Sequence, residues 1–116
     1  MKETIINFLE PRLPLPGFAA WGARLPDQTT FSHCYTDWFT ASQVENILER
    51  LAVVADYVKQ HGLEPVRLCW VFEHARIHLS QRADGSWIAC FIENRPDLNP
   101  LPLEQLLNDF AAMTED

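Results

Sequence analysis

Hydrophobic residues along the chain follow two different spacings, and each spacing predicts one kind of secondary structure. A spacing of three to four residues is typical of amphipathic helices, whereas alternation and short apolar runs are typical of strands. Helical spacing occurs in 2–10, in 41–60 and in a last segment that starts at Pro102. Strand patterns occur in 17–25, 30–35, 67–73, 76–82 and 86–93. The predicted order is therefore α-ββ-α-βββ-α, an α+β fold in a single domain over residues 1–116.

The segment 41–60 is the clearest helix. Thr40 and Gln43 match the capping box, in which a hydroxyl and an amide satisfy free backbone donors at a helix start. Gly62 is placed to end the helix in the left-handed conformation. Val53 and Tyr57 lie outside the main apolar stripe, so they predict a second contact surface. The stripe itself consists of Val44, Ile47, Leu48, Leu51, Val54, Ala55 and Val58.

The last three strands differ in their expected covering. Segments 66–72 and 86–93 are apolar at nearly every position, which predicts a sheet covered on both faces, with Cys69 and Cys90 in its core. The strand between them alternates and places His78, Ser80 and Arg82 on one polar face. The Asp-Gly pair at 84–85 predicts a hairpin turn.

Composition excludes several classes of protein. Sixteen acidic residues against nine lysines and arginines give a net charge of −7, so a basic nucleic-acid footprint is not expected. The longest apolar runs fall short of the roughly 20 residues of a membrane span, and the N-terminus lacks the pattern of a signal peptide. A cytoplasmic protein without membrane insertion is expected. Three cysteines without paired spacing predict free thiols.

Cysteine and histidine chemistry centres on the stretch RLCWVFEHARIHL, residues 67–79. Zinc sites usually combine two ligand pairs, but His74 and His78 form one pair that a turn near His74 should separate. A nucleophilic thiol needs a base within reach and a lowered pKa, and burial of Cys69 and Cys90 would disfavour the thiolate. His33 and Cys34 point to opposite faces of their strand. We therefore expect no catalytic, cofactor-binding or metal-binding residues.

Element order and pattern resemble the Roadblock/LC7 family over about residues 3–112. The resemblance rests on the small-residue strand GFAAWGARL, the long helix 41–60 and the Asp-Gly-like turn in RADGSWIACFIEN. Trp21 departs from the smaller residues usual in that first strand, and the proline-rich lead-in before it is a second departure. The resemblance implies a five-stranded antiparallel sheet with helices on both faces and carries no catalytic signature.

The resemblance also implies a homodimer in which the third strand, 67–73, pairs with its copy and the long helices add contact. Bacterial members of the family act with small Ras-like GTPases, so such a GTPase is the partner that the resemblance implies. The expected interface residues are Val53, Tyr57, Leu68, Trp70, Val71 and Phe72.

Two other functions remain open from the sequence. Acidic secretion chaperones are also small α/β dimers, but they have three strands before the long helix and two after it, the reverse of the order here. A small-ligand sensor with a PAS- or profilin-like sheet would need a pocket with convergent polar groups. Its candidate residues are His78, Ser80, Arg82 and Arg24.

Overall fold

The computed structural model describes residues 2–63 and 67–113; residues 1, 64–66 and 114–116 of the expected domain lie outside this description. Its elements follow the predicted order α-ββ-α-βββ-α, with a short 3-10 turn at Glu10–Arg12 after the first helix. The helices are α1 (Lys2–Leu9), α2 (Ala41–Gln60) and α3 (Leu101–Ala112). The strands are β1 (Phe18–Arg24), β2 (Thr30–Cys34), β3 (Arg67–Val71), β4 (Ala75–Gln81) and β5 (Trp87–Glu93).

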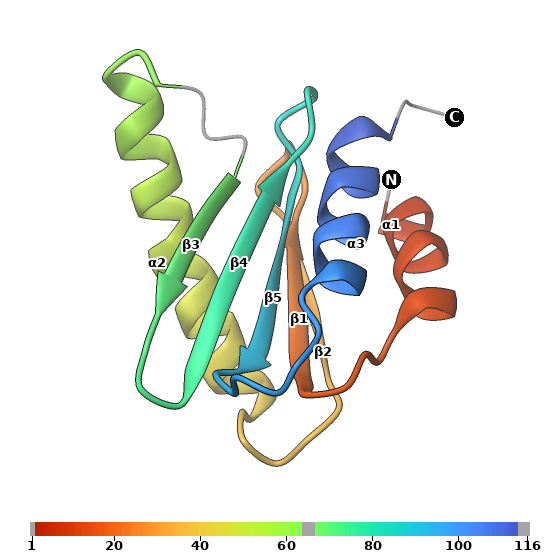
Figure 1. The fold of residues 1–116 in the computed structure, drawn as a ribbon. Coiled ribbons are helices and arrows are strands. Elements are labelled where there is room, and N and C mark those ends of the chain that lie inside the picture. The colour runs from red at the N-terminus through yellow and green to blue at the C-terminus, as the bar shows by residue number, and fades with distance from the viewer. Residues whose placement is uncertain (1, 64–66, 114–116) are drawn as a thin grey trace.

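The five strands form one antiparallel sheet in the order β2-β1-β5-β4-β3. Helix α2 covers one face, and α1 and α3 lie together over the other (Figure 1). The central strands β1 and β5 are buried almost throughout, because helices cover both of their faces. The expected α+β fold with helices on both faces is confirmed.

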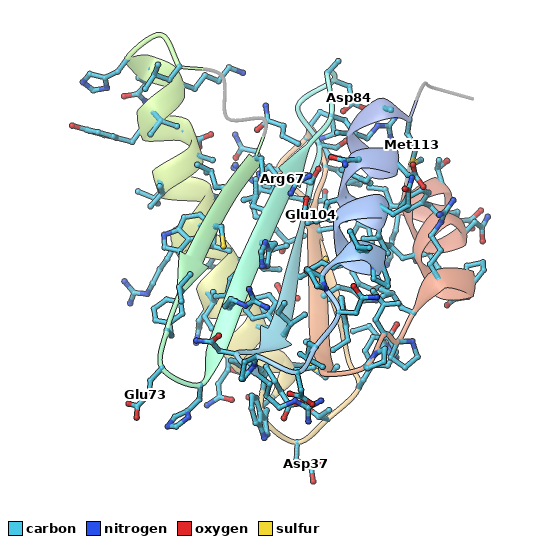
Figure 2. All side chains as sticks on the ribbon, in the orientation of Figure 1. Asp37, Arg67, Glu73, Asp84, Glu104 and Met113 are labelled. Carbon is cyan, nitrogen blue, oxygen red and sulfur yellow. The ribbon has the colours of Figure 1, made fainter. Side chains whose placement is uncertain are left out.

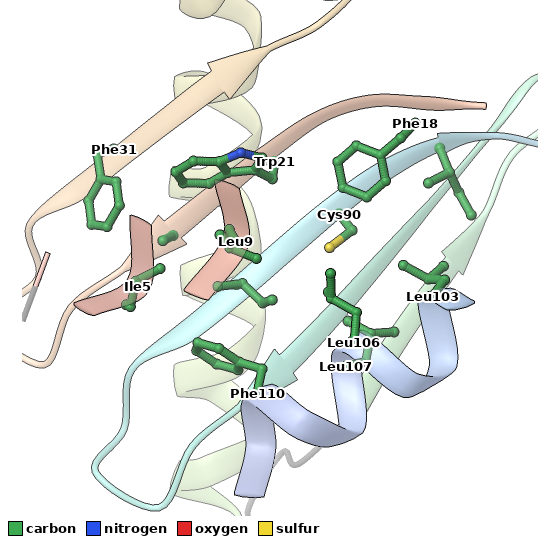
Figure 3. Close-up of a cluster of buried hydrophobic side chains, with 13 residues drawn as sticks. Ile5, Leu9, Phe18, Trp21, Phe31, Cys90, Leu103, Leu106, Leu107 and Phe110 are labelled. Carbon is green, nitrogen blue, oxygen red and sulfur yellow. The ribbon is translucent and has the colours of Figure 1, made fainter. Parts of the chain in front are cut away.

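The core beneath α1 and α3 is built from the apolar faces of these two helices. Figure 3 shows Ile5 and Leu9 of α1 beside the row Leu103, Leu106, Leu107 and Phe110 of α3, all directed toward the sheet. Each of the four α3 residues is buried, as the helical spacing predicts. The helix begins one residue earlier than expected, at Leu101. Cys90 lies fully buried in this core, as expected.

The core beneath α2 depends on small residues in β1. Leu48 is fully buried, and a methyl group at Gly22 would lie 2.5 Å from its Cδ1 atom. A glycine is thus needed for α2 to approach the sheet this closely. The capping box at the helix start is present: Thr40 Oγ1 accepts from the Gln43 amide nitrogen at 3.1 Å, and Gln43 Oε1 accepts from that of Thr40 at 2.9 Å. Gly62 adopts φ +80° at the other end.

The polar side chains of β4 share one face, as predicted, and α3 buries that face. Ser80 Oγ donates to the Leu107 carbonyl oxygen at 2.9 Å, which satisfies a hydroxyl with no exposure to solvent. The Arg82 guanidinium lies over the Phe110 ring, 5.9 Å from its centre. These two positions therefore anchor α3 to the sheet.

Candidate functional site

Strand β3 is an edge of the sheet, and half of its backbone groups face away from the protein. Within the described part of the chain it pairs with β4 on one side only. The Phe72 N–H donates to the Ala75 carbonyl oxygen at 2.8 Å, and bonded residues alternate along an antiparallel ladder. The N–H and C=O groups of Arg67, Cys69 and Val71 are therefore directed toward the free edge. A second strand placed there would find a row of donors and acceptors.

Large apolar side chains are exposed beside this edge. Val71 and Phe72 are 67% and 53% exposed at the end of β3. Val53 and Tyr57 on α2 are 69% and 60% exposed, and α2 runs alongside β3 (Figure 1). Four of the six expected interface residues are therefore exposed, on two neighbouring elements. Val54 and Leu63 are exposed as well; the helical pattern assigned Val54 to the buried stripe, because the pattern does not show where the sheet ends.

Leu68 and Trp70, the other two expected interface residues, are half-buried. Both pack against the core beneath α2, which includes Leu51 and Ala52 of that helix. They therefore brace β3 against α2 and present only part of their surface. We call the six residues Val53, Tyr57, Leu68, Trp70, Val71 and Phe72 the β3-edge surface.

The ends of the β3-edge surface are held by specific contacts. Asn94 Nδ2 donates to the Phe72 carbonyl oxygen at 2.8 Å, and the Asn94 N–H donates to the carbonyl oxygen of His74 at 3.1 Å. At the opposite end, the Tyr57 ring lies 4.5 Å from the His61 ring, centre to centre. Arg67 donates to Glu104 Oε2 of α3 at 3.0 Å and to Asn108 Oδ1 at 2.7 Å (Figure 2). The edge strand is thus tied both to α3 and to the loop after β5.

Cys69 is exposed, so the expectation that it lies in the core is wrong. The reason is its position on an edge strand, on the α3 side of the sheet, where its neighbour is His78 across the ladder. Its Sγ atom lies 3.8 Å from His78 Nε2. Partial burial nevertheless raises the pKa of the Cys69 thiol, and burial lowers the pKa of His78. Near neutral pH both groups are therefore uncharged, which does not favour an activated nucleophile.

The remaining thiols and histidines are separated in space. Burial raises the pKa of the Cys90 thiol to about 12, and it also raises that of Cys34. His74 lies exposed in the turn between β3 and β4, beside Glu73, while His78 is buried under α3. Within residues 2–63 and 67–113, no three His, Cys, Asp or Glu side chains come together as a metal site would require. No helix in this part of the chain could cross a membrane.

Comparison with known proteins bears on the fold. No family model matches the sequence, and no curated protein matches it. Among solved structures, MglB of Myxococcus xanthus is similar, with a TM-score of 0.64 over 93% of this chain and 92% of that one. The two sequences are only 8% identical, so the likeness concerns the fold alone. MglB is a GTPase-activating protein of the Roadblock/LC7 family, and the Roadblock-like fold expected from the sequence is confirmed.

Proposed function

We propose that this protein is a cytoplasmic, single-domain regulatory module that forms a homodimer through β3 and acts with a small Ras-like GTPase. It would act by binding and would leave the chemistry to the GTPase. The observation that carries the proposal is the unpaired edge of β3, with its outward backbone groups and exposed apolar side chains on the adjoining α2.

The free edge supports pairing with a second copy. An apolar edge strand that stays unpaired is an aggregation hazard, and natural proteins protect such edges with charges, prolines or covering segments. Val71 and Phe72 provide no such protection, being apolar and exposed. Antiparallel pairing of two β3 strands would satisfy the outward groups of Arg67, Cys69 and Val71 and join two sheets of five strands. It would also bring Val53 and Tyr57 of the two α2 helices toward the symmetry axis.

The likeness to MglB supports a GTPase as the further partner. That protein regulates a GTPase, and nearly its whole length shares this fold. The sequence here contains no P-loop, the motif with which P-loop GTPases hold the nucleotide phosphates. Its acidic charge of −7 suits a partner that presents a basic surface.

Substitutions at Val71 test the dimer directly. Val71→Pro removes an outward N–H donor and leaves the ladder to β4 intact, because residue 71 is not bonded to β4. Val71→Thr is the matched control, since it keeps both the N–H and a β-branched side chain. Light scattering should give twice 13.4 kDa for the wild-type protein and V71T, and 13.4 kDa for V71P. A wild-type monomer at micromolar concentration, or a V71P dimer, would contradict strand pairing.

A second pair of variants leaves the backbone unchanged. Val53→Asp places two like charges near the two-fold axis, because one substitution appears in both copies at a two-fold interface. We expect V53D to be a folded monomer and the isosteric V53T to remain a dimer. A V53D protein that stays dimeric would show that α2 lies outside the interface.

The GTPase is tested separately with purified proteins. Small Ras-like GTPases from the same genome, loaded with GDP or with a non-hydrolysable GTP analogue, would be titrated into the dimer by calorimetry. We expect one of them to bind in one nucleotide state and to bind more weakly in the other. Absence of binding by all of them in both states would refute the GTPase proposal and leave the dimer proposal untouched.

A further inference from the structure

A small cavity lies on the α3 side of the sheet, away from α2. It has a volume of about 110 Å³ and is lined by the connector before β1, by β1, β4 and β5, by the loop before α3 and by the first turn of α3. Its walls are mainly apolar and include Phe18, Ile92, Leu98 and Leu103. The dry, apolar cavities that bind small hydrocarbons in other proteins are of similar size, roughly 150 Å³.

Four polar side chains line the same cavity: Arg76, His78, Asn99 and Glu104. Asn99 Oδ1 already accepts a hydrogen bond from the Leu101 N–H at 3.1 Å. The Arg76 Nε atom is buried and has no hydrogen-bond partner among the described residues. A buried donor without a partner is unfavourable and calls for an explanation, such as a missing ligand. Glu104 differs, because its carboxylate already accepts a hydrogen bond from Arg67. Among the described residues, Arg76 is therefore the lining group without a counter-charge.

His78 does not compete with Arg76 for an anion. The residue is 8% exposed, and burial lowers its pKa, with the nearby Arg76 charge adding to the effect. The imidazole is thus neutral near pH 7 and can offer at most a neutral hydrogen bond. The positive charge of the cavity lining comes from the Arg76 guanidinium.

We propose that this cavity binds a small monocarboxylic acid with a short apolar tail. The carboxylate accepts hydrogen bonds from Arg76, including the buried Nε–H, and the tail lies among Phe18, Ile92 and Leu103. Guanidinium groups suit planar carboxylates, because two parallel hydrogen bonds can form. The cavity volume limits the size of the ligand. Drug-sized ligands need roughly 300 Å³ or more, so this cavity accepts only a ligand of a few carbon atoms.

Other ligand classes fit less well. An amine would be repelled by Arg76, and a neutral alcohol would not supply a counter-charge. The residues that the sequence suggested for a ligand pocket are mostly engaged elsewhere: Ser80 bonds to Leu107, and Arg24 pairs with Asp56. Arg76 was missed, although the alternation of β4 places it on the same face as His78.

Titration of the full-length protein with butyrate tests the proposal, with backbone amide NMR shifts as the readout. Butyrate should give saturable shifts at Phe18, His78, Ile92 and Leu103. 1-Butanol and butylamine, which have the same tail, should bind at least about tenfold more weakly, as expected for loss of a charge-assisted hydrogen bond. Absence of saturable shifts with butyrate, or equal affinity for 1-butanol, would overturn the proposal.

Variants locate the site. Arg76→Gln should weaken butyrate binding about tenfold or more, whereas Arg50→Gln, on the exposed face of α2, should leave it unchanged. An unchanged affinity in R76Q would refute the role of Arg76. Should R76Q fail to fold, Leu98→Trp tests the location of the site, because the larger side chain fills the cavity without removing the guanidinium. Butyrate binding that is retained in L98W would show that the ligand binds elsewhere. The binding is measured independently of dimer formation, since the cavity and the β3-edge surface share no residue.

Discussion

Substitution of Gly22 by alanine should destabilise the protein by driving α2 away from the sheet. The added methyl group would lie 2.5 Å and 2.6 Å from the Cδ1 and Cδ2 atoms of Leu48, where ordinary contacts exceed 3.4 Å. Leu48 is fully buried, so it cannot turn into solvent to make room. Overpacking of this kind costs about 1–3 kcal/mol. Alanine recovers about 0.5–1 kcal/mol, because glycine loses more backbone entropy on folding. The net loss of unfolding free energy should be roughly 0–2.5 kcal/mol.

A double-mutant cycle isolates this contact. Leu48→Ala alone should cost about 2–5 kcal/mol, because it leaves a cavity in the core. In the L48A background the two Cδ atoms are gone, so Gly22→Ala should become neutral or stabilising. Urea unfolding followed by circular dichroism at one fixed protein concentration gives all four free energies. Equal costs of Gly22→Ala in both backgrounds would refute the contact as the cause.

Three further measurements test other parts of the structure. Thr40→Ala removes the acceptor for the Gln43 N–H and should lower the unfolding free energy by about 1 kcal/mol. Ser42→Ala, at the exposed start of the helix, should change the unfolding free energy little. An unchanged urea midpoint for T40A would mean that the cap does not stabilise the protein. Burial lowers the pKa of His78 from 6.5, so the unfolded chain binds more protons below that pH and the unfolding free energy should fall as pH drops through 6.5. His78→Gln should flatten this part of the pH profile of stability. A slope that persists in H78Q would assign the pH dependence to another group. A thiol reagent should modify Cys69 first and Cys90 only on unfolding, and early labelling of Cys90 would contradict its complete burial.

The elements were predictable because each has a local cause. The capping pair Thr40 and Gln43 defines the start of α2, and the alternation of β4 defines which side chains share a face. Asp84 accepts from the Ser86 amide at 2.9 Å, and Gly85 adopts φ +94°, so the hairpin also follows from local chemistry. Interactions of this range are encoded within a few residues of each other.

How far the helices cover each strand was not predictable, because it depends on distant segments. Cys69 and Cys90 occur in similar apolar runs, yet one is exposed on the edge strand and the other is enclosed beneath α1 and α3. The α3 helix buries His78, while the neighbouring Val71 lies beyond its cover. The cavity beside Arg76 has the same origin, since it forms where the connector before β1 meets α3. The local pattern around a strand does not show where a helix such as α3, which comes later in the chain, will pack.

The two edges of the sheet differ in how they are protected against polymerisation. At β2, Thr30 and Ser32 both donate to the carboxylate of Glu45, at 3.0 Å and 3.2 Å. Tyr35 donates to Ala19, so alternation directs the backbone of Thr30 and Ser32 outward, next to that negative charge. An incoming strand would have to displace or bury the carboxylate, which is unfavourable. In the proposed dimer, growth by edge pairing would stop once two β3 strands have joined, because each outer end of the joined sheet presents a charged border. Replacing Glu45 with an apolar residue would open that border and turn a closed pair into a unit that can add further copies.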